Sequence, residues 1–179
     1  MDETIEQIGV YALDKELGAS FVQYACALPF PSDSGICHPG ERDMQLVRKP
    51  CEQPGAAAWK KAARSASGHI LVVQDLDVIS GQRLRAAHSA LMGLKSDSPV
   101  LVALYRERGQ DEYKVSCMKC GQKLWMRDRD VGRRGRCPRC ESKFVILSQE
   151  DHARARLGLP GDVPVLTVRG GDRETFAAL

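Results

Sequence analysis

Residues 70–105 read ILVVQDLDVISGQRLRAAHSALMGLKSDSPVLVALY and contain two apolar runs, at 70–73 and 100–105. Uninterrupted apolar runs of this length are typical of strands that are covered on both faces of a sheet. The segment between them carries one apolar stripe at helical spacing, made of Leu84, Ala87, Leu91 and Leu94. Strand, helix and strand in this order predict a βαβ unit with parallel strands. The fold class is therefore α/β, with a small parallel or mixed sheet.

Further elements are expected on both sides of this unit. Residues 4–17 have apolar side chains at helical spacing, which predicts a helix. A stretch rich in proline and glycine at 28–55 predicts a long loop with room for a short strand at 44–47. We expect an alanine-rich helix at about 54–66, and an additional strand at 163–168.

Size and composition exclude several classes of protein. The chain has 179 residues, of which 43% are hydrophobic and 27% are charged, so it can form a core. Its longest uninterrupted apolar run is too short for a membrane span, which needs roughly 20 residues. The N-terminus, Met1-Asp2-Glu3-Thr4, is acidic where a signal peptide would be basic. We therefore expect a cytoplasmic protein.

Four of the seven cysteines form two closely spaced pairs. Cys117 and Cys120, and then Cys137 and Cys140, follow the pattern C-x2-C, sixteen residues, C-x2-C. Two such turns place four sulfurs around one tetrahedral ion, and thiolate ligands favour zinc over magnesium or calcium. Iron in a rubredoxin-like site, two disulfides or four separate thiols are the alternatives. Four protein ligands leave no open position, so we expect one structural zinc ion per chain.

The segment from Val115 to Ile146 resembles the small bacterial zinc-ribbon module, with the pattern C-x2-C-G…G-x4-C-P-x-C. The matching residues are Cys117, Cys120, Gly121, Gly132, Cys137, Pro138 and Cys140, with Phe144 in the closing strand. Glu141 stands where the first pair has Gly121, which departs from the symmetrical pattern. The resemblance implies an all-β fold and metal binding for this fifth of the chain, but no particular activity.

The same segment is strongly basic. Residues 114–147 hold ten Lys and Arg but three Asp and Glu, whereas the rest of the chain has an acidic excess. In a strand at 123–127, Lys123, Trp125 and Arg127 share one face. Arg133, Arg134 and Arg136 form a second basic cluster. Cations beside an aromatic ring suit single-stranded nucleic acid. Docking on an acidic protein surface, or a core position for Trp125, is the alternative.

Asp75 and Asp77 follow the first buried strand, at the edge of the sheet where α/β proteins bind ligands. The segment resembles the aspartate-nucleophile motif of haloacid-dehalogenase-like phosphatases, which implies Asp75 as nucleophile, Asp77 as acid/base and Mg²⁺ as cofactor. Ile79 replaces the usual threonine of that motif. The segment also resembles the phosphoacceptor strand of response-regulator receivers. It further resembles the Toprim strand of primases and topoisomerases, but Gln74 stands in place of the catalytic glutamate. The simpler interpretation is a pair of solvated carboxylates.

A second group of possible ligands, Cys37, His38 and Cys51, lies in the proline-rich stretch, where separate thiols are the alternative. The sequence divides into an α/β domain at 1–108, a zinc ribbon at 113–147 and a segment at 148–179 that returns to the sheet or stays separate. We expect a non-enzymatic binding or regulatory protein whose basic ribbon contacts nucleic acid or an acidic protein. The alternative is a Mg²⁺-dependent phosphatase-like or phosphoacceptor domain that uses Asp75 and Asp77.

Overall fold

The computed structural model describes residues 5–38, 43–49, 57–74, 76, 78–94, 98–107 and 109–172. The described residues form ten β-strands: β1 (Glu6–Ala12), β2 (Ser34–Cys37), β3 (Met44–Lys49), β4 (Gly68–Val73), β5 (Val100–Arg106), β6 (Glu112–Ser116), β7 (Lys123–Arg127), β8 (Arg134–Arg136), β9 (Lys143–Val145) and β10 (Val165–Arg169). The helices are α1 (Lys15–Ala25), α2 (Ala57–Arg64), α3 (Val78–Met92) and α4 (Gln149–Leu157), with a short 3-10 helix η1 (Asp128–Asp130).

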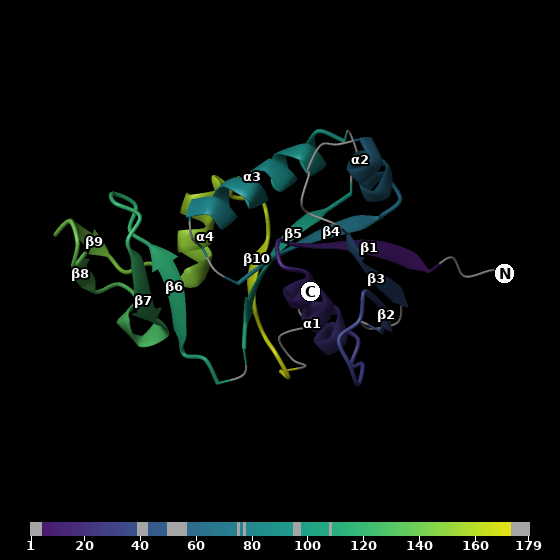
Figure 1. Cartoon of the computed structure of the whole chain (residues 1–179), viewed down its shortest axis with the longest axis horizontal. Coiled ribbons are helices and arrows are strands. Elements are labelled where there is room, and N and C mark those ends of the chain that lie inside the picture. The colour runs from purple at the N-terminus through teal and green to yellow at the C-terminus, as the bar shows by residue number, and fades with distance from the viewer. Residues whose placement is uncertain are drawn as a thin grey trace.

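Six strands form one sheet in the order β10-β5-β4-β1-β3-β2 (Figure 1). All neighbours in it are parallel except the edge strand β2, which runs antiparallel to β3. Numbered along the chain, the five parallel strands have the order 2-1-3-4-5, which is the order of doubly wound flavodoxin-like sheets. The α/β fold class is confirmed, with a mixed sheet whose interior strands are parallel.

Helices cover both faces of this sheet and create two separate cores. On one face α1 packs Phe21 and Val22 against residues of the central strands such as Val10. On the other face α2, α3 and α4 supply Trp59, Leu84 and other apolar side chains to a larger core. Because both faces are covered, the central strand β4 is buried along its whole length, as its continuous apolar sequence predicts.

The first segment of the chain differs from the sequence-based prediction. Residues 4–17 were expected to form a helix, but residues 6–12 form β1, which lies between β3 and β4, and Asp14 then caps α1. The prediction of a helix here is wrong. A strand that is covered on both faces has apolar residues on both, and their spacing can also match that of a helix. The stretch at 28–55 was expected to be a loop with a short strand at 44–47. It contains two strands of the sheet: β3, which includes the predicted strand, and β2, which was not predicted.

The remaining four strands form two antiparallel hairpins beside the β10 edge of the sheet (Figure 1). β6 pairs with β7, and β8 pairs with β9. We call residues 112–147 the cysteine module, because its two hairpins hold the paired cysteines. After the module, the chain forms α4 and then β10, which pairs parallel with β5.

Candidate metal centre

The cysteine module is built around turns that carry the sulfur atoms. In the first turn the Cys117 N–H donates to Gln122 O at 2.8 Å and the Gly121 N–H to Cys117 O at 2.9 Å. The second turn repeats this arrangement, with Cys137 N–H to Ser142 O at 3.0 Å. A small core packs beneath the turns; its buried members are Tyr113, Val115, Cys117, Leu124, Met126 and Cys137. Local hydrogen bonds therefore position the sulfurs.

The four sulfur atoms form one compact group. The Sγ atoms of Cys117 and Cys140 lie 3.8 Å apart, those of Cys120 and Cys137 lie 3.6 Å apart, and all four lie within 4.8 Å of one another. A tetrahedral ion with metal–sulfur bonds of ~2.3 Å requires sulfur–sulfur edges of ~3.8 Å. A disulfide bond is only ~2.05 Å long, and these cysteines are free. The geometry therefore fits a single metal ion, as the sequence spacing predicts.

The surroundings of Cys117 and Cys140 favour the thiolate form, which is the form that binds metal. Backbone N–H groups of the first turn and the Ser142 hydroxyl lower the pKa of Cys117 to about 6. The Ser142 side chain also lowers the pKa of Cys140, and its Oγ lies 3.1 Å from that Sγ. For Cys120, a hydrogen bond from the Gln122 backbone is outweighed by burial and the neighbouring thiols, which raise its pKa to about 12. A metal cation at the centre would stabilise the Cys120 thiolate and so lower this pKa.

The residue after each cysteine pair has a left-handed backbone conformation. Gly121 has φ of 73° and Glu141 has φ of 55°. The glycine adopts this conformation without steric cost, whereas an L side chain costs roughly 1–2 kcal/mol there. The departure from the symmetrical pattern noted at Glu141 is thus accommodated by backbone strain, and the second turn keeps the geometry of the first.

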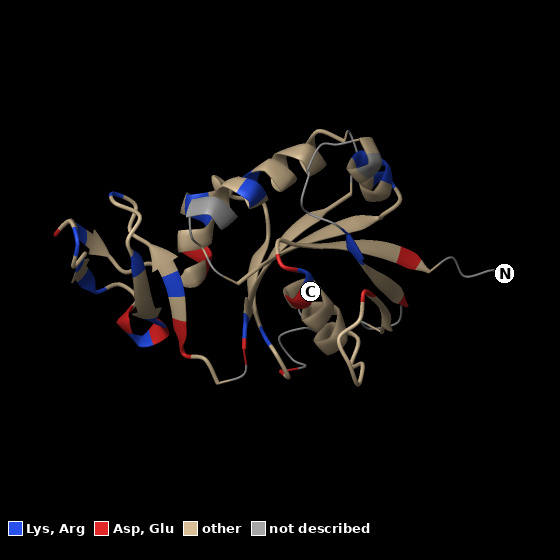
Figure 2. Cartoon of the chain, viewed as in Figure 1, with Lys and Arg blue, Asp and Glu red and all other residues tan. Residues whose placement is uncertain are grey.

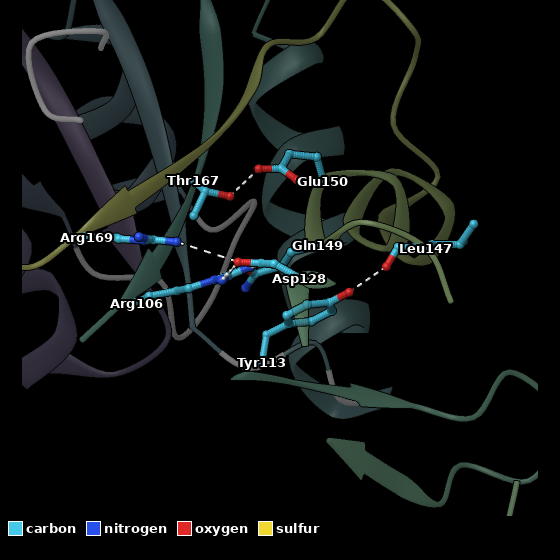
Figure 3. A network of polar contacts seen from close by, with 8 residues as sticks. All are labelled: Arg106, Tyr113, Asp128, Leu147, Gln149, Glu150, Thr167 and Arg169. Atoms are coloured by element: carbon cyan, nitrogen blue, oxygen red, sulfur yellow. Dashed lines mark hydrogen bonds and ion pairs between the residues drawn. The ribbon is translucent and has the colours of Figure 1, made fainter. Parts of the chain in front are cut away.

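A buried arginine anchors the cysteine module to the sheet (Figure 3). Arg106, at the end of β5, is 4% exposed and donates two hydrogen bonds to Asp128 of η1, at 2.7 and 2.9 Å. Its Nε donates to Gln149 Oε1 at 2.5 Å, and its guanidinium lies 4.9 Å from the centre of the Tyr113 ring. Arg169 of β10 also approaches Asp128, at 3.5 Å. Five elements are joined at this point: β5, β6, η1, α4 and β10.

Two further contacts support the module, one within it and one to the segment that follows β4. The Tyr113 hydroxyl donates to Leu147 O at 2.5 Å and so joins the two ends of the cysteine module. Leu76, just beyond β4, forms an isolated bridge with Val115 of β6. Sequence reasoning missed this whole network. Its one usable signal was an arginine closing an otherwise apolar strand, since arginine is rarely buried without a partner.

The outer face of the first hairpin carries the aromatic residue singled out from the sequence. Leu124 and Met126 are buried, and the intervening Lys123, Trp125 and Arg127 are exposed. Trp125 is 59% exposed, and the Lys114 ammonium lies 4.7 Å from the centre of its ring. A core position for Trp125 is therefore wrong, because strand alternation directs it outward while Leu124 and Met126 fill the core.

Lys and Arg lie on both hairpins of the module (Figure 2), and these cations differ in their partners. Arg127 pairs with Glu112 at 2.5 Å, and Arg133 pairs with Asp130 at 2.8 Å. Arg134 and Arg136 are exposed on one face of β8, and the exposed Lys143 is the register partner of Arg136. Glu112 and Asp130 thus partly neutralise the first two arginines.

Of the other candidate ligands, the structure describes Cys37 and His38 alone. Cys37 is partly buried at the end of β2, whereas His38 is exposed and bonded to Asp43 at 2.6 Å. Cys51, Asp75 and Asp77 lie outside the described residues, so an enzyme that uses the two aspartates remains a prediction. Across the described part of the chain, the four cysteines of the module are the one cluster of three or more potential metal ligands.

Comparisons with known proteins do not show a family for this chain. No protein-family model matches it. No curated protein matches it either. Among solved structures, it is similar to a GTP-binding protein from the hyperthermophilic archaeon Sulfolobus solfataricus in complex with GDP, with 18% identity and a TM-score of 0.42. The match covers 56% of this chain and 36% of that protein, and at this level it carries no inference about function.

Over the described ranges, no helix is both long and apolar enough to cross a bilayer.

Proposed function

We propose that the chain is a zinc-binding, non-enzymatic binding protein whose cysteine module contacts single-stranded nucleic acid. The observation that carries this proposal is the exposed Trp125, flanked by cations on a module that four cysteines hold together. The metal part and the partner part of the proposal rest on different residues, so they are tested separately.

Zinc is the ion that suits four thiolates in a tetrahedral arrangement, and all four positions are then filled by protein. Bound zinc would supply folding energy to a module whose core is too small to be stable alone. We expect metal analysis of the purified protein to give about one zinc per chain. A chelator should release four thiols together with the ion. Iron with visible absorption, or fewer released thiols, would contradict this assignment.

Nucleic acid is favoured over an acidic protein by the aromatic ring. A base can stack on the open part of Trp125, and this contributes roughly 1–3 kcal/mol per base. Phosphates would lie against the exposed cations Arg134, Arg136 and Lys143. Each neutralised phosphate on a single strand contributes about 0.7 to the slope of log affinity against log salt. An acidic protein would use the cations and gain little from the exposed ring.

The test is fluorescence anisotropy of the zinc-loaded protein with a labelled single-stranded oligonucleotide at several salt concentrations. Trp125→Ala should weaken binding about tenfold at every salt concentration, because it removes stacking. Arg134→Ala should reduce the salt slope by about 0.7. Lys61→Ala removes an exposed cation of α2 and serves as the matched control, with no expected change.

Three outcomes would overturn the assignment of the partner. Binding could be undetectable at low salt, it could be equally sensitive to Lys61→Ala, or it could be unaffected by Trp125→Ala. Polyglutamate added as a competitor separates the two classes of acidic partner. Displacement of the oligonucleotide by an equal charge concentration of polyglutamate would favour an acidic protein surface instead.

A further inference from the structure

Two cysteines outside the metal centre lie together at the opposite edge of the sheet. Cys26 follows the last residue of α1 and caps that helix, and Cys37 is the last residue of β2. Both are partly buried and pack against the core beneath α1. They are eleven positions apart in sequence and are brought together by the packing of α1 on the edge strand. No function described above uses them.

The contact of Cys26 with β2 is close. A Cβ atom placed on Gly35 would lie 2.9 Å from Cys26 Cβ and 3.0 Å from Cys26 Sγ, so only glycine leaves room for this sulfur. Gly35 and Cys37 are both half-buried, on the same side of β2, because side chains alternate along a strand. The Cys37 Sγ lies 3.5 Å from the carbonyl oxygen of Met44, its neighbour on β3. The two sulfurs therefore share one side of the edge strand.

The two thiols lie close enough for each to shift the pKa of the other, and the effect is asymmetric. A hydrogen bond from Cys26 lowers the pKa of Cys37, and the same bond, with burial, raises the pKa of Cys26 well above its usual range. Cys37 is therefore the better nucleophile, and Cys26 is held beside it as a thiol. A nucleophilic cysteine next to a second, resolving cysteine is the arrangement that redox-sensitive dithiols require.

We propose that Cys26 and Cys37 are a redox-active dithiol that hydrogen peroxide converts to a disulfide. The Cys37 thiolate attacks the O–O bond and takes one oxygen as a sulfenic acid, and the other oxygen leaves as hydroxide, which is protonated to water. The Cys26 sulfur then attacks the Cys37 sulfur, forms the S–S bond and releases the second oxygen as water. Two thiols are thus oxidised while one peroxide is reduced to two waters.

The sequence makes this reaction easy to follow. Trypsin cleaves after Lys15 and Arg42 and leaves Cys26 and Cys37 in one peptide, 16–42, which contains no other cysteine. The full-length, zinc-loaded protein is treated with hydrogen peroxide, alkylated, digested and analysed by mass spectrometry. We expect peptide 16–42 to lose two hydrogen atoms and to take up no alkyl group. Prior reduction should restore two alkyl groups.

Single substitutions identify the roles of the two cysteines. Cys26→Ser should abolish the disulfide and leave Cys37 as a sulfenic acid that dimedone traps. Cys51→Ser is the matched control and should form the disulfide as the unchanged protein does. The proposal is overturned if peptide 16–42 keeps two alkylated thiols at a peroxide dose that oxidises a free cysteine peptide. It is also overturned if either cysteine pairs with Cys51. Neither result depends on the metal centre or on nucleic acid.

Discussion

Replacing Asp128 by asparagine tests whether the cysteine module is anchored through Arg106. The substitution keeps the shape of the side chain but removes the charge that accepts two hydrogen bonds from the buried guanidinium. Breaking a fully buried ion pair costs about 3–5 kcal/mol, and exposed pairs contribute about 0–1 kcal/mol. Arg106 is 4% exposed and Asp128 is 48% exposed, so this pair lies between the two cases. We expect a loss of about 2 kcal/mol in the free energy of unfolding.

Urea unfolding of the zinc-loaded protein, followed by circular dichroism, measures this loss. Asp130→Asn is the matched control, because Asp130 pairs with Arg133, which is 70% exposed. We expect the control to change the free energy of unfolding by less than about 0.5 kcal/mol. If the two variants lose the same amount, Arg106 is not an anchor and the reasoning from its burial fails.

The same pair predicts a pH dependence of defined sign. The hydrogen bond from Arg106 lowers the pKa of Asp128 below its usual value of 3.8. The folded protein therefore binds this proton less readily than the unfolded chain does. The stabilisation is present above about pH 4 and is lost as the pH falls through the lowered pKa. The difference between Asp128→Asn and the unchanged protein should accordingly shrink at lower pH.

Three further predictions concern single residues. Glu141→Gly should raise the free energy of unfolding by roughly 0.5–1 kcal/mol in thermal melts, because glycine removes the strain of the left-handed backbone at this position. Gly121→Ala should lower the free energy of unfolding by about 1–2 kcal/mol. Effects of the same sign and size would refute the role of φ. Ser142→Ala should weaken zinc retention against a chelator about tenfold, and Ser142→Thr, which keeps the hydroxyl, should not. Burial lowers the pKa of His152 to about 4, so stability should fall between pH 6.5 and 4 by roughly 3 kcal/mol, and His152→Phe should remove that fall in urea titrations.

The parallel core was predictable because its sequence carries a strong local signal. The runs at 70–73 and 100–105 are continuous since each strand is covered by helices on both faces, and the structure places them in the neighbouring strands β4 and β5. The first strand was not predictable in this way. Val10, Tyr11 and Ala12 of β1 are buried in the cores on opposite faces of the sheet. The apolar spacing over residues 4–17 also fits a helix. The choice between the two is made by pairing with β3 and β4, which are distant in sequence.

In the candidate site, too, local features were predictable from the sequence, and features that depend on tertiary structure were not. The cysteine spacing is local, so it predicts a compact sulfur group that the fold indeed forms. Strand alternation is also local, and it predicts that Lys123, Trp125 and Arg127 share one face. The structure shows that this face is the exposed one. The partners of individual charges depend on tertiary structure. Strand pairing brings Glu112 beside Arg127, and the sequence alone does not show that this acid partly neutralises the expected binding residue.

The position of the anchor explains how a small module keeps a fixed orientation on a larger sheet. Arg106 ends the strand that enters the module, and Gln149 begins the helix that leaves it, so their hydrogen bond closes the base of the insertion. Asp128, from within the module, pairs with Arg106 at this point, and Arg169 of the last strand also approaches Asp128. A metal ion would fix the interior of the module, whereas this base fixes its direction. Metal loss and loss of the ion pair should therefore act separately: the first on the hairpins themselves, and the second on where their basic faces point.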